Sequence, residues 1–198
     1  LPADQGTGLG KPLKLINHPV RENIPIMLAA LGPKNVELAA EIADGWQPIF
    51  FHPEKAHLAW GDPLAAGRAK RDPSLGDLDV LASPALAICD ESEVPGYLEF
   101  VKPHLALYIG GMGARGKNFY NELACRYGYE DAAKEIQDLY LDGKKEEATA
   151  AVPDELARSI SLIGPASYVA ERVEAFREAG ATTLPVIPLA MGAPGRIQ

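Results

Sequence analysis

Four short apolar runs recur along the chain, each bounded by glycine, proline or acidic residues. They cover residues 24–30, 45–51, 79–89 and 182–188. Continuous apolar runs of this length are typical of strands in a parallel sheet, whose two faces are normally both covered. We therefore predict four buried parallel strands. Pro48 and Pro84 weaken two of them, because proline cannot donate a hydrogen bond to a strand ladder.

Segments with helical periodicity lie between and after these runs. They cover residues 35–43, 63–71, 95–109, 117–151 and 166–179. Pro63 suits the first turn of its helix, and Gly180 suits the position just beyond the last one, where a positive φ is common. Two helices have an apolar stripe that is spaced to face the core. In the first it is made of Val36, Leu38, Ala39, Ala40 and Ile42, and in the last of Val169, Val173 and Phe176.

The alternation of strands and helices predicts βαβ units and a parallel α/β sheet. Four strands fit either a small doubly wound sheet or half of an eight-stranded (β/α)8 barrel. The loop-like start at Leu1 and the absence of a helix after residue 188 favour the half-barrel. Such a half-barrel would expose bare sheet edges and an apolar face, so we expect it to need a partner segment.

Composition excludes several classes of function. A formal charge of −8 argues against a nucleic-acid-binding surface, and no apolar run approaches the ~20 residues that cross a bilayer. The two cysteines, Cys89 and Cys125, make neither a disulfide framework nor a metal site. We expect a reducing, cytoplasmic setting, with Cys89 a buried and inert thiol. The sequence also lacks a P-loop and a nucleophile elbow.

The loops after the strands are where a parallel α/β protein binds its ligands. The first is Leu31-Gly32-Pro33-Lys34-Asn35. Gly32 would let a phosphate oxygen approach the backbone, and Lys34 would add charge to the free amides of a helix N-terminus. The local residues alone favour the plainer interpretation that Gly-Pro starts a helix. A second pair, Gly164-Pro165, has no strong strand before it and is interpreted as structural.

Other loop residues carry weaker indications of chemistry. His52 is expected at a strand end facing the mouth of the sheet, where a simple polar surface residue is the commoner case. Asp90 is placed to cap the following helix. The glycine-rich run 109–117 has the spacing of neither a Walker loop nor a dinucleotide fingerprint. Its Arg115 and Lys117 belong either to an anion-contacting lid or to a hinge between helices.

Taken in order, these segments resemble the luciferase-like oxidoreductases, the bacterial luciferase superfamily of TIM barrels. The matching pieces are LAALGPKNVELAAEIADGWQPIFF at 28–51, the run 79–89, the segment 110–121, Leu162-Ile163-Gly164-Pro165 and residues 179–184. The match extends over most of residues 6–187 and is similar to the branch that uses the deazaflavin coenzyme F420.

This resemblance implies that the chain is the carboxy-terminal half of a (β/α)8 TIM barrel. It would comprise a leading loop at 1–22, a helical insertion at 110–158 and an irregular tail at 189–198. The complete protein would transfer a hydride between F420 and a small organic substrate. The alternatives are an FMN-dependent monooxygenase on the same barrel and a non-catalytic half-barrel that assembles with a partner chain.

The resemblance also assigns sites and partners. It implies that the cofactor phosphate contacts one loop, made of Ala30, Leu31, Gly32, Pro33, Lys34 and Asn35. It places His52, with Arg115, on the substrate side. We expect no metal and no catalytic residue in this half, so the isolated chain should be inactive. Its expected partners are the amino-terminal barrel half, a second copy in a homo-oligomer and a small-molecule substrate, with no nucleic acid or membrane.

Overall fold

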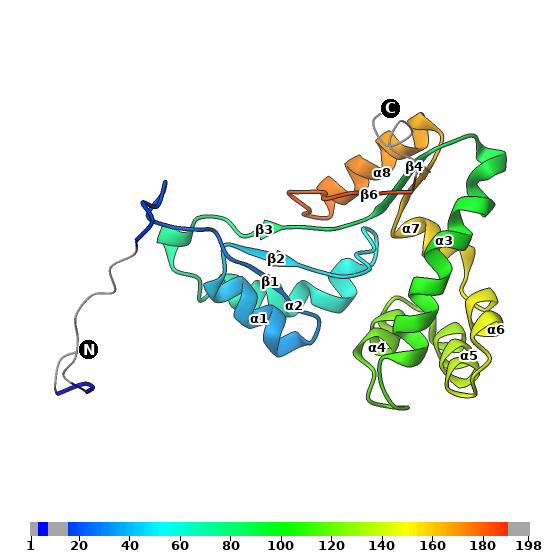
Figure 1. The fold of residues 1–198 in the computed structure, drawn as a ribbon, viewed down its shortest axis with the longest axis horizontal. Helices are drawn as coiled ribbons and strands as arrows, with labels where there is room; N and C mark the ends of the chain where they lie inside the picture. Colours follow the sequence, from blue (N-terminus) through cyan, green and yellow to red (C-terminus); the bar gives the residue numbers. More distant parts are fainter. Residues whose placement is uncertain (1–3, 8–15, 190–198) are drawn as a thin grey trace.

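The computed structural model describes residues 4–7 and 16–189 (Figure 1). Residues 16–26 contain no helix or strand: for 16–22 this is the loop expected, whereas residues 24–26 were predicted to begin the first strand, which starts only at Met27. The rest of that loop lies partly outside the described residues, and so does nearly all of the predicted tail at 189–198.

The described strands form two three-stranded sheets. The first has the order β1 (Met27–Ala29), β2 (Gly45–Gln47), β3 (Asp79–Val80), and the second has β5 (Leu162–Gly164), β4 (Ala85–Ile88), β6 (Ile187–Pro188). All pairs are parallel. A parallel bridge between Leu81 and Thr183 continues the pairing from the first sheet toward the second. The predicted parallel α/β class is therefore confirmed.

The strands are shorter than predicted, and the run 79–89 is not one strand. Pro84 has no N–H and separates β3, which pairs with β2, from β4, which pairs with β5 and β6. The run 45–51 likewise ends as a strand at Gln47, and Pro48 follows it. The prediction that Gly164-Pro165 follows no strand was wrong, because β5 leads directly into it.

Helices α1 (Pro33–Ile42) and α2 (Ala56–Arg68) cover one face of the first sheet (Figure 1). Trp46 of β2 meets Trp60 of α2 edge-on, with ring centroids 5.1 Å apart, and both indoles are fully buried. Burying two large aromatic rings removes a large apolar area from water, so this contact anchors α2 to the sheet.

The predicted helix start at Pro63 was wrong, since α2 begins at Ala56 and runs through that proline. Pro63 cannot donate to the carbonyl of Ala59 one turn earlier. Nη1 of Arg126, in helix α4 (Phe119–Arg126), instead donates to this carbonyl at 3.4 Å. A hydrogen bond from Arg126, distant in sequence, thus satisfies the carbonyl of Ala59, to which Pro63 cannot donate.

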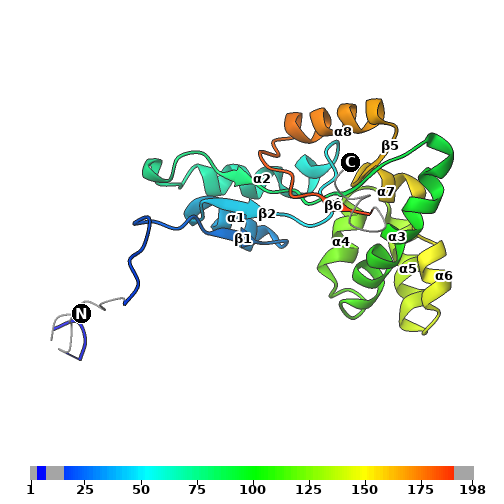
Figure 2. The same ribbon diagram turned by 45° about the horizontal axis from the view of Figure 1, so that its top comes forward.

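The remaining helices lie mostly beyond one end of the first sheet, as Figures 1 and 2 both show. They are α3 (Val94–Ala106), which continues as a π-helical turn (Leu107–Gly111), α4, α5 (Glu130–Leu141), α6 (Lys145–Ala150), α7 (Asp154–Ser159) and α8 (Ala166–Glu178). Short 3-10 turns occupy Pro73–Leu75 and Glu91–Glu93. The stretch 117–151, predicted as one helical region, is therefore three helices.

Two predicted helix caps are confirmed. The amide of Asp90 donates to Oε2 of Glu93 at 2.9 Å, as in a capping box. Gly180 follows α8 with a φ of 96°, and the next amide, of Ala181, donates to the carbonyl of Phe176 at 3.0 Å. Both ends therefore have the local chemistry that the sequence indicates.

The apolar stripes are narrower than predicted. Leu38 and Ile42 of α1 are 47% and 53% exposed, and Val173 of α8 is 40% exposed. Val36 and Phe176, on the same helices, are buried. A helix that covers only one sheet needs a narrow apolar face, so residues at the margin of the stripe reach solvent.

Within residues 4–7 and 16–189, no helix covers the second face of the first sheet. Because side chains alternate across a strand, Trp46 and Val80 point to the helix-covered face and are buried. Their neighbours Ala29, Gln47 and Asp79 point the other way and are exposed. Parallel sheets are normally covered on both faces, so these exposed residues are unusual, and two of them, Ala29 and Gln47, border the cavity described below.

Candidate functional site

A cavity of about 550 Å³ lies at the carboxyl ends of β1, β2 and β3, the end of a parallel sheet at which α/β proteins bind ligands. From the second sheet, it meets the amino ends of β4, β5 and β6. Its volume falls within the ~300–1,000 Å³ that is usual for small-molecule sites. The sheet contributes Ala29, residues 47–51 and residues 83–85. The rest of the lining comes from Phe100, Val101 and His104 of α3 together with Ile160, Ser161, Phe176, Ile187 and Leu189.

The lining is mostly apolar, and none of its described residues carries a formal charge at neutral pH. Its four polar side chains belong to Gln47, Ser83, His104 and Ser161. Nε2 of Gln47 donates to Oγ of Ser83 at 3.4 Å, and Oγ of Ser161 donates to the carbonyl of Ala157 at 2.7 Å. His104 makes no side-chain hydrogen bond within the described residues. His104 is exposed, and the partial burial of its ring lowers its pKa, which favours the neutral imidazole.

Phe50 forms one wall of the cavity in an unusual backbone conformation. Its φ is 50°, a left-handed value that no other non-glycine residue in the described part of the chain adopts. The hydroxyl of Tyr127, which is buried, donates to the carbonyl of Phe50 at 3.0 Å. The Phe50 ring meets His104 and Tyr108 edge-on, each at a centroid distance of 5.5 Å. Buried contacts thus hold Phe50 in its strained conformation. In this conformation its ring forms an aromatic surface of the cavity.

His52 does not line this cavity, although the sequence led us to expect it at the mouth. It is 3% exposed, and its ring packs against Tyr127 with centroids 5.4 Å apart. Nδ1 lies 3.0 Å from Oε2 of Glu54, yet neither ring nitrogen makes a hydrogen bond of good geometry within the described residues. Burial lowers the pKa of His52, while Glu54 opposes that effect.

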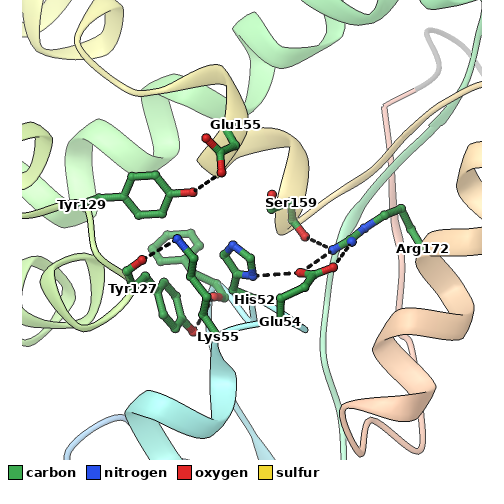
Figure 3. A network of polar contacts seen from close by, with 9 residues as sticks. His52, Glu54, Lys55, Tyr127, Tyr129, Glu155, Ser159 and Arg172 are labelled. Atoms are coloured by element: carbon green, nitrogen blue, oxygen red, sulfur yellow. Dashed lines mark hydrogen bonds and ion pairs between the residues drawn. The ribbon is translucent and has the colours of Figure 1, made fainter.

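Glu54 belongs to a polar network that joins α2 to the carboxy-terminal helices (Figure 3). It pairs with both terminal nitrogens of Arg172, on α8, whose Nη2 also donates to the carbonyl of Ser159 at 2.7 Å. Burial alone would raise the pKa of Glu54, but the hydrogen bonds and charge of Arg172 lower it. On the other side, Nζ of Lys55 donates to the carbonyl of Tyr127 at 2.6 Å. This network stabilises the segment that carries Phe50.

The predicted phosphate loop is held at its start by the two buried tryptophans. The carbonyl of Ala30 accepts from Nε1 of Trp46 at 2.9 Å, and that of Leu31 accepts from Nε1 of Trp60 at 3.1 Å. The carbonyl of Gly32 is used as well, because the amides of residues 35 and 36 donate to it at 3.1 and 3.0 Å. The amide of Asn35 is therefore not free, contrary to the expectation from sequence.

Pro33, Lys34 and Asn35 are exposed at the start of α1. Gly32 has φ −71° and ψ 148°, which any residue adopts, and an added Cβ would make only an ordinary contact with the Phe119 ring, at 3.5 Å. Neither conformation nor packing within the described chain therefore requires glycine there. The helix N-terminus and the Lys34 side chain fit an anion such as a phosphate, whereas the Phe119 ring lies over the Cα of Gly32.

Arg115 is exposed and lies outside the cavity lining. Its Nε pairs with Oδ1 of Asp138, on α5, at 2.8 Å. Close packing explains why glycines precede it in the sequence. A Cβ on Gly110 or Gly111 would overlap the side chain of Tyr140. The run 109–117 is thus packed against α5 where it links α3 to α4.

The structure brings together some of the predicted site residues and separates others. Ala29 lines the cavity and directly precedes the loop 30–35, so these two features adjoin. His52 and Arg115 lie elsewhere. Sequence reasoning missed His104, whose only signal is a histidine within the apolar pattern of α3, and the φ of Phe50, for which the sequence gives no signal.

The two cysteines and the helices carry no further site. Cys89 and Cys125 are half-buried free thiols, and burial raises the pKa of each. No group of three or more potential metal ligands occurs in residues 4–7 and 16–189. Across the same residues, no helix combines the length and the apolar character needed to cross a membrane.

Comparison with known proteins decides the family. The model of the luciferase-like monooxygenases matches residues 7–183. The chain belongs to this family. A Mycobacterium tuberculosis protein, named as a putative coenzyme F420-dependent oxidoreductase, is 42% identical to this luciferase-like chain over 183 residues. That alignment covers 91% of the chain and 52% of the relative. The resemblance inferred from sequence is confirmed.

A solved structure shares the fold. The coenzyme F420-dependent tetrahydromethanopterin reductase from Methanopyrus kandleri matches with a TM-score of 0.62 and 24% identity, over 84% of this luciferase-like chain and 45% of the reductase chain. At this identity the likeness concerns the α/β fold alone. The chain spans about half the length of both relatives.

Proposed function

We propose that this luciferase-like chain is part of a coenzyme F420-dependent oxidoreductase that transfers a hydride between the deazaflavin and a small organic substrate. The observation that carries the proposal is the 42% identity to the M. tuberculosis protein, whose name specifies F420. The cavity at the carboxyl ends of the first sheet's strands supports it, because it offers a ligand site of suitable size next to the N-terminus of α1.

In this proposal, the loop 30–35 binds the cofactor phosphate. The exposed Lys34 supplies its ammonium and its backbone amide to the anion at the N-terminus of α1, where the helix dipole also favours negative charge. The two tryptophan hydrogen bonds to Ala30 and Leu31 fix the loop in place. The bound deazaflavin supplies the hydride chemistry, while the chain binds and orients it.

The cavity residues provide the surroundings of the reaction. Ala29 places the start of the cavity beside the phosphate loop, so a cofactor held at α1 extends toward it. The Phe50 wall is apolar and is supported by its contacts with His104, Tyr108 and Tyr127. His104, which is exposed, makes no side-chain hydrogen bond within the described residues, and Gln47 and Ser83 each keep a hydrogen-bonding group beside it that can contact a bound molecule.

We further propose that additional (β/α) units cover the open face of the first sheet and complete a barrel. The exposed Ala29, Gln47 and Asp79 support this, since they lie on the face opposite α1 and α2. The test is to express the chain with the segment that corresponds to the unmatched part of the M. tuberculosis relative. Slower amide exchange in β1 and β2 on co-expression is the expected result, and unchanged exchange would contradict it.

An FMN-dependent monooxygenase on the same fold is the second candidate. The description of the family, luciferase-like monooxygenase, favours it. The two candidates differ in cofactor, so the deciding experiment is a fluorescence titration of the protein, with its barrel complete, against F420 and FMN in parallel. Saturable binding of F420 at least tenfold tighter than FMN is the expected result. Tighter binding of FMN would replace the proposal by its alternative.

A further inference from the structure

We propose that residues 50–55 are an acid-sensitive switch: protonation of His52 opens the contact between this segment and the carboxy-terminal helices, and so releases the Phe50 wall of the cavity. The contact joins two groups of side chains, His52, Glu54 and Lys55 on one side and Tyr127 and Arg172 on the other (Figure 3). This switch goes beyond the proposed function and does not depend on the identity of the cofactor.

The imidazole of His52 is buried without a hydrogen bond. The residue is 3% exposed, and neither ring nitrogen has a hydrogen-bond partner of good geometry within the described residues. A neutral imidazole still has one donor and one acceptor, so its burial has a desolvation cost that no partner offsets. Any local opening that exposes the ring to water removes this cost.

Positive groups outnumber negative ones around the ring. Oε2 of Glu54 lies 3.0 Å from Nδ1 of His52, but this carboxylate is already paired with both terminal nitrogens of Arg172. The charges of Lys55 and Arg172 both disfavour a proton on the imidazole. Protonation of His52 would therefore set three cations against a single carboxylate in a contact from which water is largely excluded.

The neighbours on the carboxy-terminal side do not compensate for this charge. The ring of Tyr127 packs on the imidazole with centroids 5.4 Å apart, and burial raises the pKa of its hydroxyl, which stays neutral. Burial also raises the pKa of Tyr129, to about 12. From α7, Glu155 faces the same network, but its Oε1 accepts from the hydroxyl of Tyr129 at 3.3 Å. None of these groups supplies the second negative charge that a protonated His52 would need.

Acid therefore favours the open arrangement. Burial lowers the pKa of His52 below its ordinary 6.5, the charges of Lys55 and Arg172 act in the same direction, and Glu54 opposes them. An imidazole that reaches water regains its ordinary pKa and binds a proton more readily than the buried ring. The ratio of open to closed molecules should rise as the pH falls below 6.5, by at most about tenfold per pH unit for one proton.

Opening this contact alters the cavity because residues 50–55 continue directly from its wall. The carbonyl of Phe50 accepts from the hydroxyl of Tyr127 at 3.0 Å, and the carbonyl of Tyr127 accepts from Nζ of Lys55 at 2.6 Å. Tyr127 thus contacts both ends of the segment and, through its ring, His52 between them. When the segment separates from Tyr127, Phe50 loses the hydrogen bond that supports its positive φ.

Amide hydrogen exchange of the full chain tests the proposal. The amides of Lys55 and Ala56 both donate to the carbonyl of His52, at 3.0 and 2.7 Å, so their protection factors report the opening of this segment. Between about pH 7 and about pH 5.5 these factors should fall about threefold or more. The amide of Ala43, which donates to Ala39 in α1, should keep its protection factor. No fall at Lys55 and Ala56, or an equal fall at Ala43, would overturn the proposal, because the opening would then be absent or global.

A neutral replacement assigns the effect to the imidazole. His52→Gln cannot take up a proton, so the protection of Lys55 and Ala56 should become independent of pH. The matched control is His57→Gln, on the exposed side of α2, which should retain the fall. A fall of unaltered size in His52→Gln would overturn the proposal.

A change on α8 tests the arrangement of charges. Arg172→Gln leaves Glu54 free to pair with a protonated His52, so the fall in protection should be at most about half as large. Arg177→Gln, on the same helix, removes an exposed arginine that pairs with Glu174 and should leave the fall unchanged. An equal or larger fall in Arg172→Gln would overturn the part assigned to these charges.

The link to the cavity wall has its own test. In Tyr127→Phe, which loses the hydrogen bond to Phe50, the protection of Lys55 and Ala56 should be lower about threefold or more at both pH values, relative to that of Ala43. Unchanged protection would show that residues 52–56 open independently of Phe50 and would overturn the link.

Discussion

The hydroxyl of Tyr127 donates a 3.0 Å hydrogen bond to the carbonyl of Phe50, across a separation of 77 residues. Phe50 has a positive φ and forms part of the cavity wall, and Tyr127 is 2% exposed. Burial raises the pKa of Tyr127, so its hydroxyl stays protonated and remains a donor. A side chain at the end of α4 thereby holds a strained residue that shapes the candidate site.

Removing this hydroxyl should cost stability. Tyr127→Phe leaves the buried carbonyl of Phe50 without its partner, and we expect the free energy of unfolding to fall by about 1–2 kcal/mol. Urea denaturation measures the change. The matched control is Tyr129→Phe, whose hydroxyl reaches Glu155 at 3.3 Å in an exposed pair and should contribute less than about 0.5 kcal/mol. Equal effects of the two variants would contradict this account of Phe50.

His52 should make the stability depend on pH. Burial lowers the pKa of its imidazole below the ordinary 6.5, so the unfolded chain takes up a proton more readily than the folded one. This contribution to stability is complete above pH 6.5 and is lost as the pH falls toward the lowered value. The loss should reach about 1 kcal/mol per pH unit.

The measurement is the free energy of unfolding at about pH 7.5 and about pH 5.5. His52→Phe should lose less stability on acidification than the unaltered chain. His57→Phe, an exposed histidine on α2, should show the unaltered dependence. If His52→Phe and the unaltered chain respond equally to acid, the buried imidazole is not the responsive group.

The alternation of strands and helices could be predicted because each element has a local signal. The caps at Asp90 and Gly180 are further examples, since each satisfies groups within its own helix end. The start of α2 was predicted wrongly because a proline normally marks the first turn of a helix. Here Arg126, far along the chain, donates to the carbonyl that Pro63 leaves without a donor, so the helix continues through the proline. Strand β5 was missed because its three residues are too few to show a pattern.

The candidate site was less predictable than the fold. The loop 30–35 was found from its Gly-Pro pair, which is a local feature. The neighbours of His104 and the strain at Phe50 arise from tertiary contacts with α4 and its flanking residues, which no short-range pattern encodes. His52 was predicted to lie at the mouth of the sheet because it follows a strand. The positive φ of Phe50 changes the direction of the backbone there, and the imidazole of His52 is buried instead.

Close packing at the glycine run gives another prediction. A Cβ on Gly110 would lie 2.9 Å from Cγ of Tyr140 and 3.0 Å from the carbonyl oxygen of Ile136. We expect Gly110→Ala to lower the free energy of unfolding by about 2 kcal/mol through overpacking.

The matched control is Gly96→Ala on α3, where a Cβ would meet nothing within 4 Å among the described atoms. That change should raise stability by up to about 1 kcal/mol, because alanine favours the helix. Urea denaturation of both variants measures the contrast. If Gly110→Ala stabilises the protein instead, residues 109–117 do not pack against α5, and the interpretation of this run as an anion-contacting lid is favoured.

The central claim is that the N-terminus of α1 binds the phosphate of F420. Its most direct test compares the affinity of the protein, with its barrel complete, for F420 and for the phosphate-free deazaflavin chromophore. Lys34→Glu is the test variant, and Lys144→Glu makes the same charge change at an exposed position after α5. F420 should bind the unaltered protein at least about tenfold more tightly than the chromophore, and Lys34→Glu should abolish that preference while Lys144→Glu retains it. Equal affinities for the two ligands, or a preference that survives Lys34→Glu, would contradict the claim.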